Sequence, residues 1–223
     1  MKKISLKLIV AIFAILSFSY ALYAQEENNR SPKFTYEAGF GKSILAGFQN
    51  MSPWGVHYRG NYNSGYGINA QFNYIFKDRS LLGLKFDGFG VAGNYKIEDN
   101  QLVTENINTY YLAPQLGWWR SISPRVSFLS NIGVGYALYQ SSGLLDNTEY
   151  SIYSHMLGFN VDISLDYLIT KQTSIGCKTS VFGAFSDKQY REIGGEKSEF
   201  KMDKWNKINP SKIDFSIFYR IYF

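Results

Sequence analysis

Most of this chain alternates between apolar and polar residues with a period of two. The alternation is clearest in residues 66–76, 126–138, 157–169 and 213–223. In each stretch one parity is apolar and uncharged, although 18% of the whole chain is charged. Successive side chains of a β-strand point to opposite sides, whereas a helix places its apolar residues three and four positions apart. The period therefore predicts β-strands in these stretches and excludes amphipathic helices.

Four weaker stretches, residues 34–42, 81–95, 106–120 and 174–185, alternate in the same way and bring the expected total to eight strands. Tight turns are expected at residues 77–80, 121–124 and 170–173. Longer loops are expected at residues 43–64, 96–105, 141–150 and 186–210. Short and long connections in alternation are typical of an antiparallel up-and-down meander. Both termini would then lie at the short-turn end.

The N-terminal segment has the pattern of a secretory signal peptide. Three lysines among the first seven residues precede an apolar run, and small residues follow it up to Ala24. We expect cleavage between Ala24 and Gln25, with the bond after Ala21 as the alternative. A membrane anchor is the other interpretation, but the run is shorter than the ~20 residues of a helical span. The expected organisation is a signal peptide at 1–24, a short polar lead at 25–33 and a β-barrel at 34–223.

Charge and cysteine content exclude several classes of site. The formal net charge is +5, but without the three lysines of the signal peptide 20 basic residues face 18 acidic ones. This balance argues against a nucleic-acid partner, which requires a clustered basic face. Cys177 is the single cysteine, so neither an intrachain disulfide nor a cysteine-based zinc site can form.

Side-chain size predicts which face of the strands is outside. The apolar faces are bulky and aromatic, whereas the opposite faces are rich in Gly, Ser, Asn and Asp. Because the interior of an eight-stranded barrel is small, large residues fit better outside and small polar ones inside. That arrangement is the reverse of a soluble barrel such as a lipocalin, the alternative interpretation, and it predicts a transmembrane barrel. Aromatic belts are expected at the short-turn end (Phe76, Trp118, Tyr167, Tyr219, Phe223) and at the long-loop end (Tyr66, Tyr110, Tyr136, Tyr139).

The last strand resembles the C-terminal signal of bacterial outer-membrane β-barrel proteins. It ends in Phe223, with apolar residues at alternate positions before it: Phe215, Ile217, Tyr219 and Ile221. Residues 110–117, YYLAPQLG, also look like a mid-barrel strand of that family. With the signal peptide, the chain resembles the small eight-stranded, porin-like barrels of the OmpA and OmpX type. The resemblance implies an outer-membrane location and insertion by the machinery that reads the last strand.

The polar faces predict a network of charges inside the barrel. Glu37, Lys85, Asp166, Lys178 and Arg220 each lie a few residues from the short-turn end of their strand, so they would share one layer. Closing the barrel pairs the first and last strands and brings Glu37 near Arg220. Unpaired charges there would be costly, so we expect salt bridges. We interpret the network as a structural plug, with an ion path as the alternative.

No motif in the sequence predicts catalysis, a cofactor or a metal. Residues 88–93 match GxGxxG, but no helix is expected after them, so we read the glycines as part of a strand. His57 and His155 are the two histidines, and a pairing of His155 with Ser154 is conceivable, although no recognisable motif surrounds them.

We therefore expect a non-enzymatic outer-membrane barrel that presents four extracellular loops for binding. A narrow channel for ions or small solutes is the first alternative, and a lipid-modifying enzyme is the second. Trp54, Tyr58 and Tyr62 in the first long loop are possible contact residues for an unknown extracellular ligand, because such residues dominate binding hot spots. The charged segment 186–210 could face lipopolysaccharide phosphates, which with membrane lipid and the insertion machinery are the expected partners.

Overall fold

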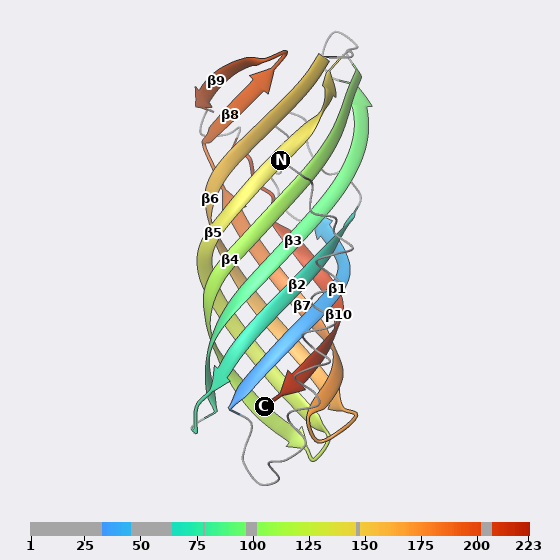
Figure 1. Ribbon diagram of the computed structural model, residues 1–223, viewed down its shortest axis with the longest axis vertical. Helices are drawn as coiled ribbons and strands as arrows, with labels where there is room; N and C mark the ends of the chain where they lie inside the picture. The colour runs from blue at the N-terminus through green and yellow to red at the C-terminus, as the bar shows by residue number, and fades with distance from the viewer. Residues whose placement is uncertain (1–32, 46–63, 78, 97–101, 146–147, 202–206) are drawn as a thin grey trace.

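The computed structural model describes residues 33–45, 64–77, 79–96, 102–145, 148–201 and 207–223 (Figure 1). The expected signal peptide and most of the first long loop, with Trp54, Tyr58 and Tyr62, lie outside these residues. Among the described residues, no helix is long and apolar enough to cross a membrane.

The described residues form ten strands, and every strand pair is antiparallel. They are β1 (Phe34–Leu45), β2 (Gly65–Ile75), β3 (Ser80–Lys96), β4 (Leu102–Ser123), β5 (Val126–Leu145), β6 (Thr148–Leu168), β7 (Thr173–Phe185), β8 (Lys188–Ile193), β9 (Glu196–Lys201) and β10 (Lys212–Tyr222).

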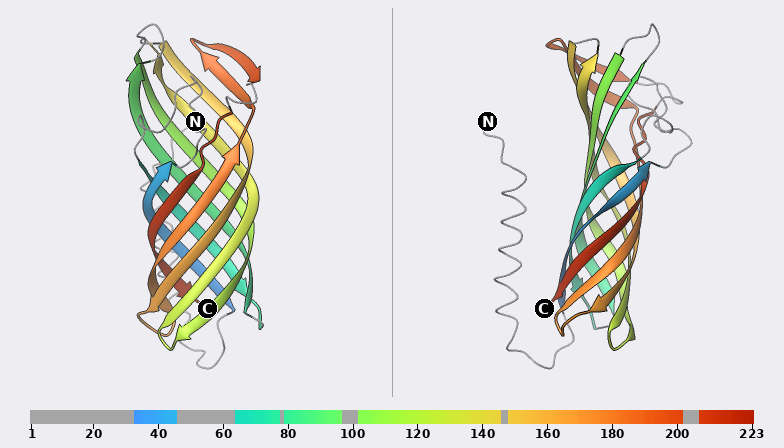
Figure 2. Two further views of the ribbon diagram at one scale, coloured as in Figure 1. Left: turned by 180° about the vertical axis from the view of Figure 1, so that it is seen from behind. Right: turned by 90° about the vertical axis from the view of Figure 1, so that its right-hand side faces the viewer.

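Eight of these strands close into a barrel, which confirms the predicted fold. Strands β1 to β6 each pair with the next in sequence, and β10 closes the ring by pairing with both β7 and β1. In that closing pair Glu37 lies directly opposite Arg220. The barrel is all-β, antiparallel and up-and-down, and strands are tilted against its long axis (Figure 2).

The outward-facing side chains are apolar and the inward-facing ones polar, as predicted. On β6, Leu157 is 71% exposed and Phe159 51%, whereas the alternate residue Asp162 is fully buried. The same contrast holds on β2, where Ile68 is exposed and Asn69 and Gln71 are buried. Exposed apolar residues and buried polar ones are the arrangement of a barrel whose outer solvent is lipid.

The barrel wall is much taller on one side than on the other. Strands β3 to β6 contain 17, 22, 20 and 21 residues, whereas β1, β2, β7 and β10 contain 11 to 13. The described residues of the predicted loops at 96–105 and 141–150 are therefore strand. The polarity inverts in this upper wall: Val103, Ile107 and Ile152 are buried inside, while Gln140 and Ser142 face outward. Apolar and polar residues still alternate there, but the apolar ones now face inward and the polar ones outward, as expected where the outer solvent is water.

A β-hairpin extends the tall wall sideways at the long-loop end. Strand β8 pairs with β6 over Tyr150–Tyr153, and β9 pairs with β8 (Figures 1 and 2). The hairpin turn is Gly194–Gly195, with φ of 57° and 89°. A two-residue turn of this kind requires positive φ at both positions, which glycine adopts without strain. The segment 186–210, predicted as a loop, thus contains ordered strands.

Candidate functional site

The interior near the short-turn end holds a four-residue network centred on Arg220. Its guanidinium donates to Glu37 Oε2 at 2.5 Å and to Asp166 Oδ1 at 2.9 Å. Lys178 Nζ donates to the other oxygen of Glu37 at 2.5 Å. All four side chains are buried, and together they carry two positive and two negative charges. We call Glu37, Asp166, Lys178 and Arg220 the lower network.

Neutral groups add further hydrogen bonds to the lower network. Asp166 accepts from the Ser174 and Tyr222 hydroxyls, each at 2.5 Å, and Lys178 donates to Asn69 at 2.5 Å. Phe218 lies beneath both cations, with its ring centroid 4.6 Å from Arg220 Cζ and 6.0 Å from Lys178 Nζ. A buried charge is tolerated when it is paired and hydrogen-bonded in this way. The charges of the network are therefore compensated by the protein's own groups.

Lys85, the fifth predicted member, makes its ion pair in a separate layer. Its ammonium donates to both oxygens of Asp162, at 2.7 and 2.9 Å, and to Ser180 at 2.9 Å. Asp162 lies further from the short-turn end of β6 than Asp166 does. The prediction that all five charges share one layer is therefore wrong for Lys85, because its long side chain reaches toward the long-loop end.

A third layer, around Lys212, was not predicted. Lys212 Nζ donates to Asp87 and Asp214, both at 2.7 Å, and lies 5.2 Å and 5.8 Å from the ring centroids of Phe89 and Phe182. Lys212 has the same parity as Asp214, so the alternation of β10 would have placed it inside. It was missed because the predicted strand began one residue later.

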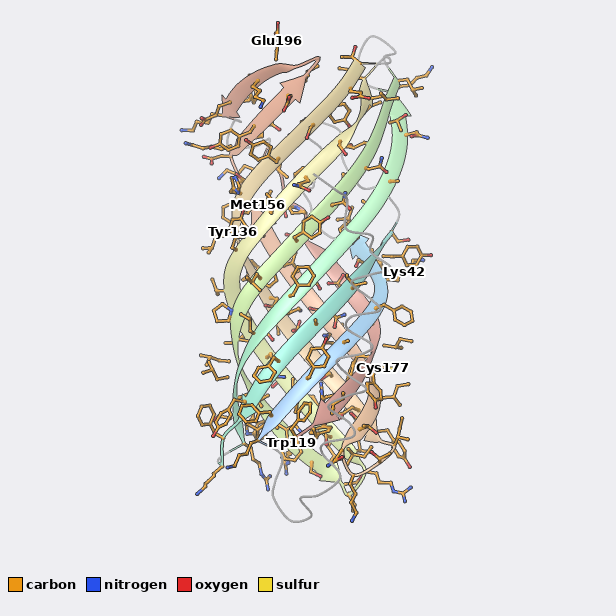
Figure 3. The ribbon with its side chains drawn as sticks, viewed as in Figure 1. Lys42, Trp119, Tyr136, Met156, Cys177 and Glu196 are labelled. Atoms are coloured by element: carbon orange, nitrogen blue, oxygen red, sulfur yellow. The ribbon has the colours of Figure 1, made fainter. Side chains whose placement is uncertain are left out.

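Buried apolar side chains gather beyond the charged layers at both ends of the lumen. At the short-turn end, Ile75, Leu81 and Leu129 pack together, with Trp119 against them. Figure 3 labels Trp119 near this end of the barrel. At the long-loop end a larger cluster lines the inner face of the tall wall. Its members are Val103, Ile107, Tyr111, Ala113, Ala137, Tyr139, Tyr150, Ile152, Met156, Phe182, Ala184 and Ile208. Tyr139, predicted for the outer aromatic belt, belongs to this inner cluster because its parity is opposite to that of Tyr136.

The residues of the predicted C-terminal signal mostly face outward. Phe215, Ile217, Tyr219 and Phe223 are 37–52% exposed. Ile221 is an exception at 1% exposed. Its direct cross-strand neighbour is Tyr36, a large ring on the same face, and such pairs lie within contact distance.

His155 lies on the outer face of the barrel at the upper border of the apolar band. Its Nδ1 is 2.5 Å from the Tyr136 hydroxyl, and its ring neighbours the stacked rings of Tyr153 and Tyr190. Ser154 points to the opposite side, where it is buried and donates to the Lys188 carbonyl. Adjacent residues of a strand cannot meet, so the conceivable His155–Ser154 pairing does not form.

Comparisons with known proteins identify the fold. No protein-family model matches the chain, and no curated protein matches it in sequence. Among solved structures, the outer membrane protein OprG from Pseudomonas aeruginosa matches with a TM-score of 0.63 and 13% identity, covering 87% of this chain and 97% of OprG. A major outer membrane protein from Thermus thermophilus matches with a TM-score of 0.56 and 14% identity, covering 87% of this chain and 100% of that one. The chain therefore has the fold of the small bacterial outer-membrane β-barrel proteins.

Proposed function

We propose that this protein is a non-enzymatic barrel of the bacterial outer membrane, closed to solutes, that presents its long-loop end for binding at the cell surface. The observation that carries the proposal is the filled lumen. Three layers of buried ion pairs lie between two apolar clusters, and each charged group described in these layers has a partner of opposite charge. An ion path needs water and exchangeable ligands along its length, whereas these charges bind each other.

The outward surface supports the membrane part of the proposal. The outer face of β6 is apolar from Leu157 to Leu165 and ends in Tyr167, whereas His155 and Ser151 begin a polar section above it. The roughly twelve residues between Leu157 and Ile169 span about 40 Å along a strand, or about 30 Å of height at a tilt of ~40°. That height matches the ~30 Å hydrocarbon core of a bilayer.

The tall wall and the β8–β9 hairpin support the binding part. They form an ordered surface beyond the apolar band, and the hairpin's outer face carries mixed charges in exposed pairs, Lys188–Glu199 at 3.5 Å and Lys197–Glu192 at 3.8 Å. We assign this end to the cell exterior, where it would meet lipopolysaccharide and an unidentified ligand. The exposed residues of β10 would be read by the insertion machinery.

Conductance in planar bilayers tests the closed lumen. The purified barrel, reconstituted at a known number of molecules per membrane area, is expected to give no steps in current above the background of the lipid alone. The matched variant Glu37→Gln with Arg220→Gln is expected to give no steps either, because the other two layers of ion pairs and both apolar clusters remain. Stable single-channel steps from the unaltered protein would instead support the channel alternative.

Location and partners can be tested together in intact cells. A tag inserted at Gly194–Gly195 should be accessible to antibody without permeabilisation, because that turn is the tip of the hairpin. A tag that becomes accessible only after the outer membrane is opened would contradict the proposed orientation. Crosslinking through the exposed tag, followed by mass spectrometry, would then identify the ligand.

A further inference from the structure

Among the described residues, the charged side chains exposed at the short-turn end of the barrel are all basic. They are Lys33, Lys77, Arg79, Arg120, Arg125 and Lys171. Asp78, between Lys77 and Arg79 in sequence, lies outside the described residues. The described acidic residues nearest to them, Glu37 and Asp166, are buried in the lower network. The long-loop end, in contrast, mixes both signs. We call the six basic residues the basic rim.

We propose that the basic rim binds the phosphate groups of anionic phospholipids in the adjacent membrane leaflet. The inference rests on the proposed membrane location but not on the loops or the closed lumen. Its partner is identified by chemistry: phosphate at the surface of a bilayer attracts Lys and Arg side chains that reach the interface.

The position of Arg120 distinguishes a lipid headgroup from a soluble anion. Along the outer face of β4, Leu116 is 61% exposed, Trp118 43% and Ile122 61%. Arg120 lies between Trp118 and Ile122 on that face, with its Cζ 6.0 Å from the Trp118 ring centroid. A guanidinium flanked by exposed apolar side chains lies at the level of the lipid surface. The nearest anionic group there is a headgroup phosphate.

Aromatic residues of the lower belt hold a second guanidinium of the rim. Arg125 Nη1 donates to the Tyr167 hydroxyl at 3.1 Å, and Tyr167 is 47% exposed on the outer face of β6. An interfacial tyrosine places its ring in the apolar region and its hydroxyl at headgroup depth. The bond therefore keeps the Arg125 charge at the same depth.

The backbone of the rim is fixed to neighbouring strands. The carbonyls of Lys33, Arg79 and Arg125 accept hydrogen bonds from Ile75 N at 2.7 Å, Trp119 N at 2.9 Å and Leu168 N at 2.8 Å, respectively. Three of the six basic residues are thus held at defined places around the barrel. Their charges are carried on a fixed backbone and not on mobile tails.

Arg79 occupies a backbone conformation that disfavours it. Its φ is 71°, and it is the one non-glycine residue with positive φ among the described residues. Glycine or asparagine would adopt this turn conformation at lower cost. The turn geometry therefore does not explain an arginine at this position, whereas a requirement for its charge does.

Lipid association measured by spin label tests the proposal. The refolded barrel is placed in phosphatidylcholine vesicles that contain spin-labelled phosphatidylglycerol or spin-labelled phosphatidylcholine, and the motionally restricted fractions are compared. One headgroup contact with a basic residue favours the anionic lipid by a factor of about five at low salt. We expect a preference of that order, which decreases in concentrated salt.

Two sets of variants assign the preference to the rim. Arg79→Gln, Arg120→Gln and Arg125→Gln together should lower the ratio clearly, and the preference that remains should come from Lys33, Lys77 and Lys171. The matched control at the other end, Lys188→Gln, Lys197→Gln and Lys201→Gln, should leave it unchanged. Arg79→Asn should lower the ratio while raising the resistance of the barrel to urea, because it removes the unfavourable φ and the charge together. A lower lipid ratio together with a higher resistance to urea would show that Arg79→Asn removes a binding group and does not damage the fold.

Several results would overturn the proposal. Equal association of the two lipids, or a preference that the triple rim variant leaves unchanged, would refute it. Rim-dependent binding of inorganic phosphate in uncharged detergent would assign the rim to a soluble anion. Rim-dependent binding of isolated peptidoglycan in place of lipid would assign it to the cell wall. A barrel that inserts into no vesicle would overturn the membrane location as well, whereas insertion without headgroup preference would refute the rim proposal alone.

Discussion

Replacing Arg220 by Gln should destabilise the barrel more than any other single change in the lower network. The substitution removes ion pairs at 2.5 Å to Glu37 and at 2.9 Å to Asp166. Glu37 keeps Lys178, but Asp166 keeps only the hydroxyls of Ser174 and Tyr222. A buried charge left without its partner costs about 3–5 kcal/mol, and we expect a loss of that size in the free energy of unfolding.

The double variant Glu37→Gln with Arg220→Gln gives a sharper result. It removes one charge of each sign, so the interior keeps Lys178 and Asp166 and stays balanced. We expect its cost to be smaller than the sum of the two single costs by about 1–3 kcal/mol, as for residues in one ion-pair network. The measurement is equilibrium urea unfolding in vesicles, with Lys197→Gln as a surface control that changes stability by less than about 1 kcal/mol. Additive single costs, or an Arg220→Gln variant as stable as the unaltered barrel, would show that the network contributes no coupled stability.

The barrel wall allows three more tests. A Cβ at Gly135 would lie 2.2 Å from the Leu112 carbonyl oxygen, so Gly135→Ala should cost about 1–3 kcal/mol in urea unfolding, whereas Gly88→Ala, whose nearest contact would be 3.5 Å, should be close to neutral. A spin label on Cys177, exposed on the outer face, should be relaxed by oxygen dissolved in lipid and not by a water-soluble nickel complex; the reverse pattern would contradict the lipid-facing assignment. Deleting Phe223 should slow the appearance of the heat-modifiable folded band in cells, while refolding in detergent stays unchanged; equal slowing in both would indicate a structural role.

The alternation of the sequence was sufficient to predict the ring, and the size of the side chains on each face predicted which face is outside. In the four clearest stretches one parity is uncharged and, apart from Ser130, apolar, which predicts the strands. The bulk of that parity then predicts that it faces lipid. Closure of the ring then follows, and it places Glu37 opposite Arg220. Extended one residue toward the N-terminus of the last stretch, the same rule places Lys212 inside, and within that stretch it places Tyr222 inside.

The upper wall could not be predicted in the same way, because its pattern changes sign. On β4 the exposed apolar residues Leu112 and Leu116 have even numbers, while the buried apolar residues Val103 and Ile107 have odd ones. A search for one apolar face per strand ends the strand where the parity changes. The partners of Lys85 could not be deduced either, because a long side chain reaches across the lumen to strands distant in sequence.

The unequal height of the wall determines how the molecule would meet a ligand. A strand of 22 residues, such as β4, is about 70 Å long and rises about 55 Å at a tilt of ~40°. Roughly 25 Å of it therefore stands clear of a hydrocarbon core of ~30 Å. This projecting half-cylinder is hydrogen-bonded sheet with its own apolar lining, so a molecule docking there would contact a preorganised scaffold. Little chain entropy would be lost on association, and recognition would depend on the shape of the scaffold more than on the adaptability of loops.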